Sequence, residues 1–172
     1  MSQTKVLDAA EELFYDRGIH AVGMDDIRTI SGVSLKRLYQ LFPSKEALVV
    51  GYLERRDRRW RGSLADFVAA GTGDRVLLMF DWLHDWFAEP GFRGCAFINS
   101  FGEMGTTSAA IMSIVRHHKD ALRAYVISVC PDVAVADQVL LLIDGAITIA
   151  AITRDPSAAH RAQAAAARLI SG

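Results

Sequence analysis

The sequence predicts an all-α protein, and three observations support this fold class. Apolar residues recur at three- and four-residue spacing along most of the chain, which is the spacing of one helix face. No stretch of useful length alternates apolar and polar residues as a half-buried strand does. The prolines stand far apart and leave room for long helices between them: Pro43, Pro90, Pro131 and Pro156.

The first two predicted helices cover residues 2–17 and 25–30. Apolar side chains fall on one face of the first, and Gly18 is expected to end it as a left-handed cap. The second is short, and we expect it to bury Ile27 and Ile30.

A sharp turn and a third short helix are expected next. Gly32 supplies the turn, Val33 fills the core, and Ser34 is a good N-cap for a helix over residues 35–41. Leu38 faces inward on that helix, together with Phe42.

A long helix is predicted from the segment Pro43-Ser44-Lys45-Glu46 to about residue 70. The proline ends the preceding helix, Ser44 caps the new one, and Glu46 lies favourably near the positive end of its dipole. Such a helix would be about 40 Å long and able to link two domains. Further helices are expected over about 74–88, 94–105, 107–129, 132–154 and 157–170.

The charge distribution is more informative than the formal net charge of −1. Residues 34–61 hold eight basic and three acidic side chains, and the remainder is mildly acidic. A basic region near the N-terminus indicates an end that faces nucleic acid. The arginines within 55–61 are interpreted as a solvated helix face rather than as part of that contact.

Several classes of protein are disfavoured by composition. The two cysteines are too few for a disulfide framework, which indicates a reducing cytoplasm. The apolar run 139–152 is shorter than the roughly 20 residues of a membrane span and contains Asp144, so a buried helix is the better interpretation. We find no catalytic set, phosphate loop or zinc spacing, so no enzyme activity, cofactor or metal is expected.

Residues 27–48 have the layout of a helix-turn-helix: a short helix, a glycine turn, and a second short helix with a basic outer face. A recognition helix needs an inner face that fixes it to its scaffold and residues that reach base edges in the major groove. Over residues 6–48 the chain resembles the TetR family of transcriptional regulators, most specifically in Gly32-Val33-Ser34, Leu38-Tyr39 and the run from Phe42 to Leu48.

The resemblance implies a helix-turn-helix DNA-binding domain over residues 1–48 and a helical effector-binding and dimerisation domain over 49–172. Tyr39 and Lys45 would contact phosphates, Lys36 and Arg37 guanine or phosphate, and Gln40 adenine or phosphate. The chain departs from the family in carrying Val22 and Gly23 where Thr or Ser is common. The complete implied DNA-contacting set is Ser34, Leu35, Lys36, Arg37, Tyr39, Gln40, Ser44 and Lys45.

The resemblance also implies a cytoplasmic homodimer, formed through residues 132–170, that binds double-stranded operator DNA and not a membrane. A small apolar or amphipathic inducer would release this repressor from the operator. The expected ligand lining is apolar with a few polar groups, although core packing remains the alternative for each member: Phe97, Asn99, Phe101, Met104, Met112 and His117.

Cys95 offers a second functional interpretation. A cysteine near Arg93 is compatible with a redox- or electrophile-sensing regulator, whereas a buried inert thiol is the structural alternative. Asp81, His84 and Asp85 share a helix face, and a salt-bridged surface is favoured there over a metal site.

Overall fold

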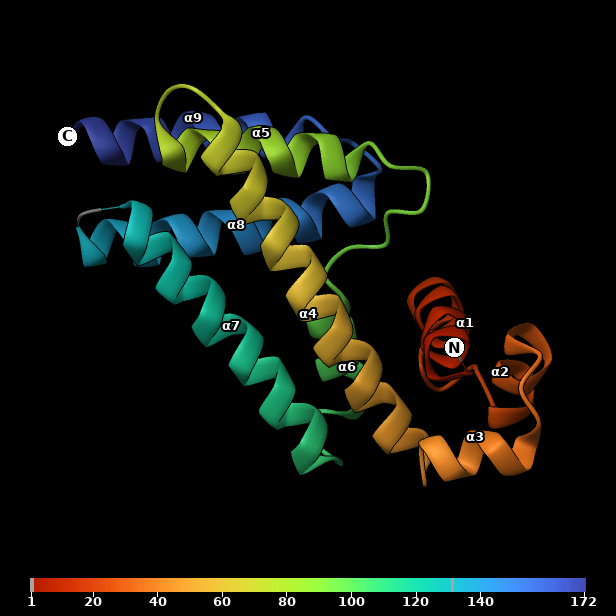
Figure 1. The fold of residues 1–172 in the computed structure, drawn as a ribbon. Helices are drawn as coiled ribbons and strands as arrows, with labels where there is room; N and C mark the ends of the chain where they lie inside the picture. The colour runs from red at the N-terminus through yellow and green to blue at the C-terminus, as the bar shows by residue number, and fades with distance from the viewer. Residues whose placement is uncertain (1, 131) are drawn as a thin grey trace. The chain divides into compact units, whose positions relative to one another are not determined.

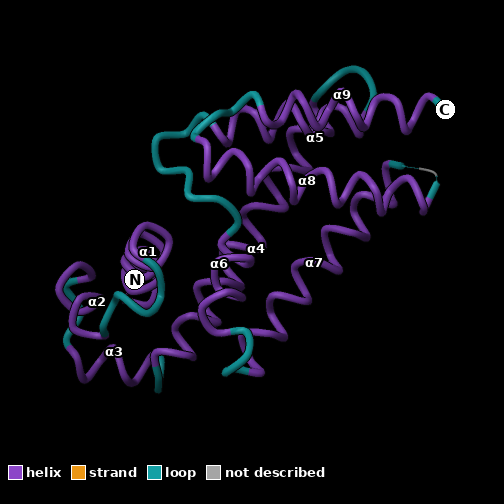
Figure 2. The backbone as a smooth tube through the Cα atoms, turned by 180° about the vertical axis from the view of Figure 1, so that it is seen from behind, coloured by secondary structure: helices purple, strands orange, loops and turns teal. Residues whose placement is uncertain are grey.

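The computed structural model describes residues 2–130 and 132–172, which form helices joined by loops, with no strand among them (Figure 2). This confirms the predicted all-α class. In chain order the helices are α1 (Ser2–Arg17), α2 (Met24–Ser31), α3 (Leu35–Leu41), α4 (Lys45–Ala70), α5 (Arg75–Phe87), α6 (Ala96–Met104), α7 (Ala109–Val129), α8 (Val133–Thr153) and α9 (Ala158–Ser171) (Figure 1).

The chain divides into two compact units. The first comprises Met1–Arg58 and Ala96–His118, and the second comprises Arg59–Cys95 and Lys119–Gly172. α4 and α7 therefore each contribute residues to both units. The functional boundary that we expect after residue 48 stays a prediction, because it divides the chain by role rather than by packing.

Apolar faces of α1 to α4 meet in the core of the first unit. Leu13 and Phe14 of α1, Ile27 of α2 and Leu38 of α3 are all buried. The ring of Phe14 lies 5.9 Å from that of Tyr52 on α4, between centroids. Burial of an apolar side chain of this size contributes roughly 1.5–3 kcal/mol, so these contacts hold the short helices in place.

The expectation that Ile30 is buried was wrong, because half of its surface (50%) is exposed. Ser31 takes the inward position instead, one full helical turn after Ile27. Its hydroxyl accepts a hydrogen bond from the backbone N–H of Val33 at 3.3 Å. The inward face of α2 is therefore set by four-residue spacing, and Ile30 is left on the surface.

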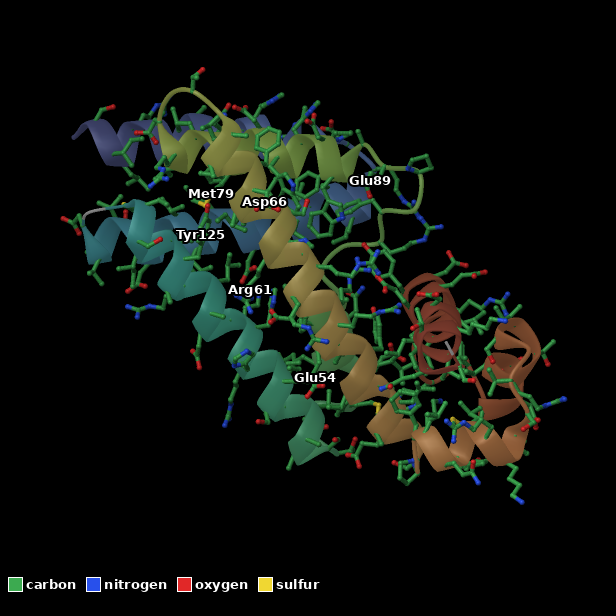
Figure 3. All side chains as sticks on the ribbon, in the orientation of Figure 1. Glu54, Arg61, Asp66, Met79, Glu89 and Tyr125 are labelled. Carbon is green, nitrogen blue, oxygen red and sulfur yellow. The ribbon has the colours of Figure 1, made fainter. Side chains whose placement is uncertain are left out.

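α5, α8 and α9 lie side by side in the second unit (Figure 1). Alanines at the contact between α8 and α9 are fully buried, among them Ala150 and Ala166, and small side chains of this kind allow close helix approach. Met79 of α5, labelled in Figure 3, is completely buried. Trp60 meets Trp82 edge-on, with 5.0 Å between ring centroids.

α8 is apolar nearly all round, as expected, but this single chain buries only 33% of its most apolar window. By length and composition alone the helix would also pass as a membrane span. Leu141 and Ile152 are 73% and 74% exposed. The expected burial of the run 139–152 is therefore met on one face only, because Val139 and Ile143 are buried while Leu141 and Ile152 remain exposed among the described residues.

An aspartate orders the start of α9. Asp155 accepts hydrogen bonds from the backbone N–H of Ser157 at 2.9 Å, from its hydroxyl at 2.8 Å, and from Arg161 at 2.8 Å. The bond from Arg161, followed by the two from Ser157, lowers the pKa of the Asp155 carboxyl from 3.8 to about 2. A carboxylate held in this way stabilises the fold only while it is ionised.

We expect the stabilising effect of Asp155 to disappear in acid. Its folded pKa lies below its unfolded value, so the contribution is present above about pH 4 and is lost as the pH falls to about 2. Thermal unfolding of wild type and Asp155→Asn, followed by circular dichroism from pH 6 to pH 2, should give melting temperatures that converge in acid. Asp66→Asn, on the exposed surface of α4, serves as the control. A gap between wild type and Asp155→Asn that is independent of pH would contradict the assignment.

Candidate nucleic-acid interface

The turn between α2 and α3 has a defined backbone geometry. Gly32 adopts φ 65°, a left-handed conformation that favours glycine, and its N–H donates to the carbonyl of Arg28 at 3.0 Å. The side chain of Ser34 accepts a hydrogen bond from the backbone N–H of Arg37 at 3.3 Å. The turn and the N-cap that the sequence predicts are therefore both confirmed.

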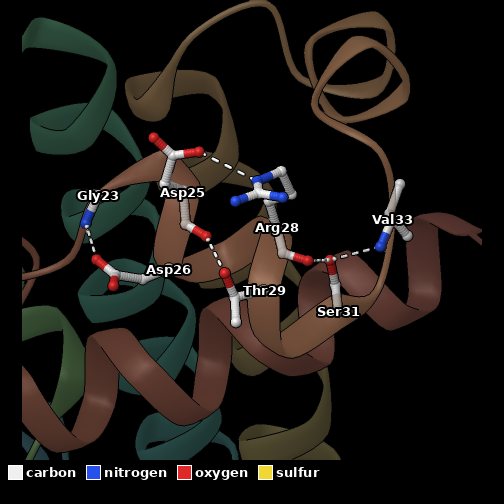
Figure 4. Close-up of polar contacts among 7 residues, drawn as sticks. All are labelled: Gly23, Asp25, Asp26, Arg28, Thr29, Ser31 and Val33. Carbon is white, nitrogen blue, oxygen red and sulfur yellow. Dashed lines mark hydrogen bonds and ion pairs between the residues drawn. The ribbon is translucent and has the colours of Figure 1, made fainter.

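The start of α2 is closed by an acidic side chain. Gly23 has no side chain that could act as a cap, and its own N–H donates to Asp26 at 2.8 Å (Figure 4). Asp25 forms an ion pair with Arg28 at 3.1 Å and accepts the hydroxyl of Thr29 through its backbone carbonyl at 2.8 Å (Figure 4). Carboxylates suit the positive end of a helix, so α2 is stabilised without the Ser or Thr cap that this chain lacks.

α3 presents one buried and one exposed face. Leu38 is fully buried, and Phe42 just after the helix is nearly so. On the other face of α3, Tyr39 is 46% exposed. Beyond the helix, the side chain of Ser44 caps α4 by accepting a hydrogen bond from the backbone N–H of Ala47 at 3.0 Å. Lys45 is partly exposed, whereas the remaining predicted DNA-contacting residues are exposed: Ser34, Leu35, Lys36, Arg37, Tyr39, Gln40 and Ser44.

Arg55 and Arg56 do not belong to a solvated helix face. This corrects the interpretation of the arginines within 55–61 that was based on the sequence. Arg55 forms ion pairs with Asp8 and Glu11 of α1, both at 2.8 Å, and Arg56 pairs with Glu11 at 3.1 Å. Arg56 also lies over the ring of Tyr15, 3.8 Å from its centroid. These two cations attach α4 to α1, so the charge of residues 34–61 is less available to a partner than the sequence suggests.

Glu103, at the end of α6, binds the loop that follows α1. Its carboxylate accepts the backbone N–H groups of Ile19 at 2.9 Å and His20 at 2.8 Å, and its carbonyl contacts the His20 ring at 3.0 Å. A Cβ at Gly18 would stand 3.3 Å from both carboxylate oxygens, so glycine leaves room for the contact. Nothing in the local sequence around Glu103 marks it for this contact, so its role could not be predicted from the pattern of neighbouring residues.

A second contact joins the segment after α6 to the start of α4. The hydroxyl of Ser108 donates to the carboxylate of Glu46, while Ser108 also accepts the N–H of Ile111 at 3.1 Å. The segment from Glu103 to Ser108 is therefore attached to the helix-turn-helix region at two separate points.

The six predicted ligand-lining residues lie in the first unit but differ in exposure. Phe97 is buried, and Met104 and Met112 are partly exposed. Asn99, Phe101 and His117 are exposed. Their assignment to a ligand site stays a prediction.

The neighbouring histidine, His118, is the buried one. Its Nδ1 lies 2.7 Å from Asp57, and its ring stacks on Phe97 with 3.7 Å between centroids. The buried positions of α7 run through Ile111, Val115, His118 and Leu122 at three- and four-residue spacing, and that spacing is the sequence signal that separates His118 from His117.

The remaining candidates for chemistry are occupied or enclosed. Cys95 is only 7% exposed, which favours an inert thiol over a sensor. Asp81 accepts a hydrogen bond from Gln163 at 2.6 Å, and His84 stacks on His160 with 4.2 Å between centroids. Across residues 2–130 and 132–172, no group of three His, Cys, Asp or Glu side chains is placed to hold a metal ion.

Comparison with known proteins agrees with the helix-turn-helix geometry. The model for bacterial regulatory proteins of the tetR family matches residues 6–51. The HTH-type transcriptional activator FasR of Mycolicibacterium smegmatis is 51% identical over 51 residues, and an HTH-type transcriptional regulator of Mycobacterium tuberculosis is 41% identical over 59 residues. These matches cover 30% and 34% of this chain but only 23% and 29% of the relatives, so the whole chain is not compared with them.

The similarity to solved structures extends over the full length. The TetR-family regulator SCO4454 of Streptomyces coelicolor superposes with a TM-score of 0.90 at 25% identity, covering 99% of this chain and 94% of that one. A putative regulator from Streptomyces avermitilis gives 0.80 at 25% identity, covering 97% and 98%.

We expect Glu103→Gln to loosen the loop after α1, because the amide retains only one acceptor oxygen for the two N–H groups that the carboxylate binds. Loss of a charge-assisted bond costs roughly 1–2 kcal/mol, or about a tenfold rise in local opening. Amide hydrogen exchange at Ile19 and His20, measured by NMR, checks this. Glu12→Gln on the exposed face of α1 is the control, and protection equal to wild type at both amides would contradict the assignment.

Proposed function

Because residues 6–51 match the model for the tetR family of bacterial regulatory proteins and the fold superposes on TetR-family regulators, we propose that the chain is a regulator of this family and binds operator DNA through α3. The observation that carries this proposal is the two-sided character of α3. Leu38 fixes the helix from within, while Lys36 and Gln40 stand on its exposed side. A helix so held can enter the major groove, which admits an α-helix, and present side chains to base edges.

The proposed contacts divide into readout and positioning. Lys36 is suited to the acceptor edge of guanine and Gln40 to adenine, whereas Leu35 offers an apolar contact to a thymine methyl group. Tyr39, Ser44 and Lys45 are assigned to phosphates, which fix register without reading sequence. At the start of α2, Val22 and Gly23 stand where Thr or Ser is common, and the nearby carboxylates of Asp25 and Asp26 make a phosphate contact there unfavourable.

We infer that the active form is a homodimer formed through residues 132–170. A groove of about 290 Å³ between α8 and α9 is lined mainly by apolar and small side chains, among them Leu141, Gly145, Ile149 and Ala165. Exposed apolar area of this kind is costly in water and supports burial against the same surface of a second copy. Two-fold symmetry then favours a palindromic operator with half-sites about one helical turn apart, or a multiple of that.

We further propose repression relieved by a small apolar or amphipathic inducer, held near Phe97, Asn99, Phe101, Met104, Met112 and His117. An inducer can shift the protein between two conformers only if it binds one of them more tightly than the other. The proposed inducer would prefer the conformer in which the spacing of the two α3 helices does not fit the operator. α4, which contributes to both compact units, is the proposed lever. Such a regulator works in the cytoplasm, needs no membrane or cofactor, and is not an enzyme.

Selection of bound duplexes from random DNA tests operator binding. We expect enrichment of a palindrome, and we expect Lys36→Ala to lower affinity for it by about 1–3 kcal/mol while relaxing preference at one base position. Arg116→Ala, an exposed cation on α7, is the charge-matched control. If wild type enriches no sequence, sequence-specific regulation loses its basis.

Dimerisation is tested separately by Leu141→Glu. A carboxylate placed on a largely exposed apolar position costs little in the single chain but is strongly unfavourable in a closed interface. Sedimentation velocity should show a dimer for wild type and a monomer, or a dissociation constant raised more than about tenfold, for the variant. Ala124→Glu, exposed on α7, should remain dimeric, and an unchanged dimer in Leu141→Glu would place the interface elsewhere.

A further inference from the structure

A hollow lies beside the start of α3. It has a volume of about 310 Å³ and lies between the first turns of α1 and the turn that leads into α3. Its lining includes two cationic side chains and two hydroxyl-bearing ones, and no acidic side chain: Ser2, Lys5, Gly32, Val33, Ser34 and Arg37.

The positive charge at this hollow is not neutralised from within the first unit. For residues 2–130 and 132–172 the structure records no ion pair to Lys5 or Arg37; the guanidinium of Arg37 makes a 3.4 Å hydrogen bond to the neutral side chain of Gln40. Asp8, one turn after Lys5 on α1, is bound to Arg55 instead. Two cations at a concave surface with hydroxyl donors between them suit a singly charged oxyanion.

The position of the hollow relative to α3 indicates which oxyanion would bind there. α3 has seven residues and is about 10 Å long, close to the roughly 12 Å width of the major groove. Lys45 follows one end of α3, and the hollow adjoins the other. Cationic groups therefore stand beyond both ends of α3, where the phosphates that flank a groove-bound helix lie.

We propose that a phosphodiester of the operator backbone occupies this hollow, held by Lys5 and Arg37 with the hydroxyls of Ser2 and Ser34. This inference rests on the proposed function and extends it to a residue outside the helix-turn-helix, Lys5 of α1. It also assigns Arg37 to the backbone, which leaves Lys36 and Gln40 as the polar side chains that read bases. Lys5 then sets affinity and register but not sequence preference.

The test compares Lys5→Gln with wild type on the selected operator and on a scrambled duplex, over a range of salt concentrations. We expect Lys5→Gln to weaken binding to both duplexes about three- to tenfold and to reduce the slope of log affinity against log salt by about 0.9, the value for one phosphate contact. Arg37→Gln should behave in the same way. Arg17→Gln, at the other end of α1, makes the same change of charge and should match wild type.

A neutral methylphosphonate, moved one linkage at a time across the half-site, locates the contact. At one linkage the substitution should weaken DNA binding by the wild-type protein but leave the affinity of Lys5→Gln unchanged. An unchanged salt slope in Lys5→Gln, or a changed base preference, overturns the proposal while operator binding stands. If the wild-type protein binds no duplex, the proposed function itself is overturned. Circular dichroism serves as the folding control, because equal helical signals show that all variants are folded.

Discussion

The burial of Leu38 is the constraint on which the proposed interface depends. α3 has seven residues, far fewer than an isolated helix needs to be stable in water, so its conformation must come from tertiary contacts and caps. Leu38 supplies the apolar contact, Ser34 closes the first turn, and Gly32 sets the direction from which the helix starts. Because these elements use only the inner face and the ends, the outer side chains are not needed for folding and remain available for recognition.

Charged residues elsewhere in the first unit serve mainly to join helices. Arg55 and Arg56 hold α4 against α1 through Asp8 and Glu11, so these two cations of the basic run add little open positive surface. The buried contact between His118 and Asp57 joins α7 to α4 in the same unit. Burying such a pair is expensive unless it is well bonded, so these contacts favour one packing arrangement over others.

The segment between α6 and α7 gives residues 96–118 a direct mechanical connection to the helix-turn-helix. Glu103 binds the loop after α1, and Ser108 binds Glu46 at the start of α4. Any rearrangement of the segment that carries Phe97 and Met112 must keep or break these bonds. The inducer response proposed above would therefore act through contacts that join residues 96–118 to the helix-turn-helix region.

The sequence by itself determined the local features: the all-α class, the N-caps Ser34 and Ser44 at which helices begin, the turn at Gly32, and the inward orientation of Leu38. Each follows from side-chain chemistry within a few residues, which the chain order displays directly. Only the tertiary structure decided that Ile30 is exposed, that Asp57 is the partner of His118, and that Glu103 and Lys5 lie beside the helix-turn-helix. Those outcomes depend on contacts between residues up to 84 positions apart, and local periodicity carries no information about which distant side chain arrives there.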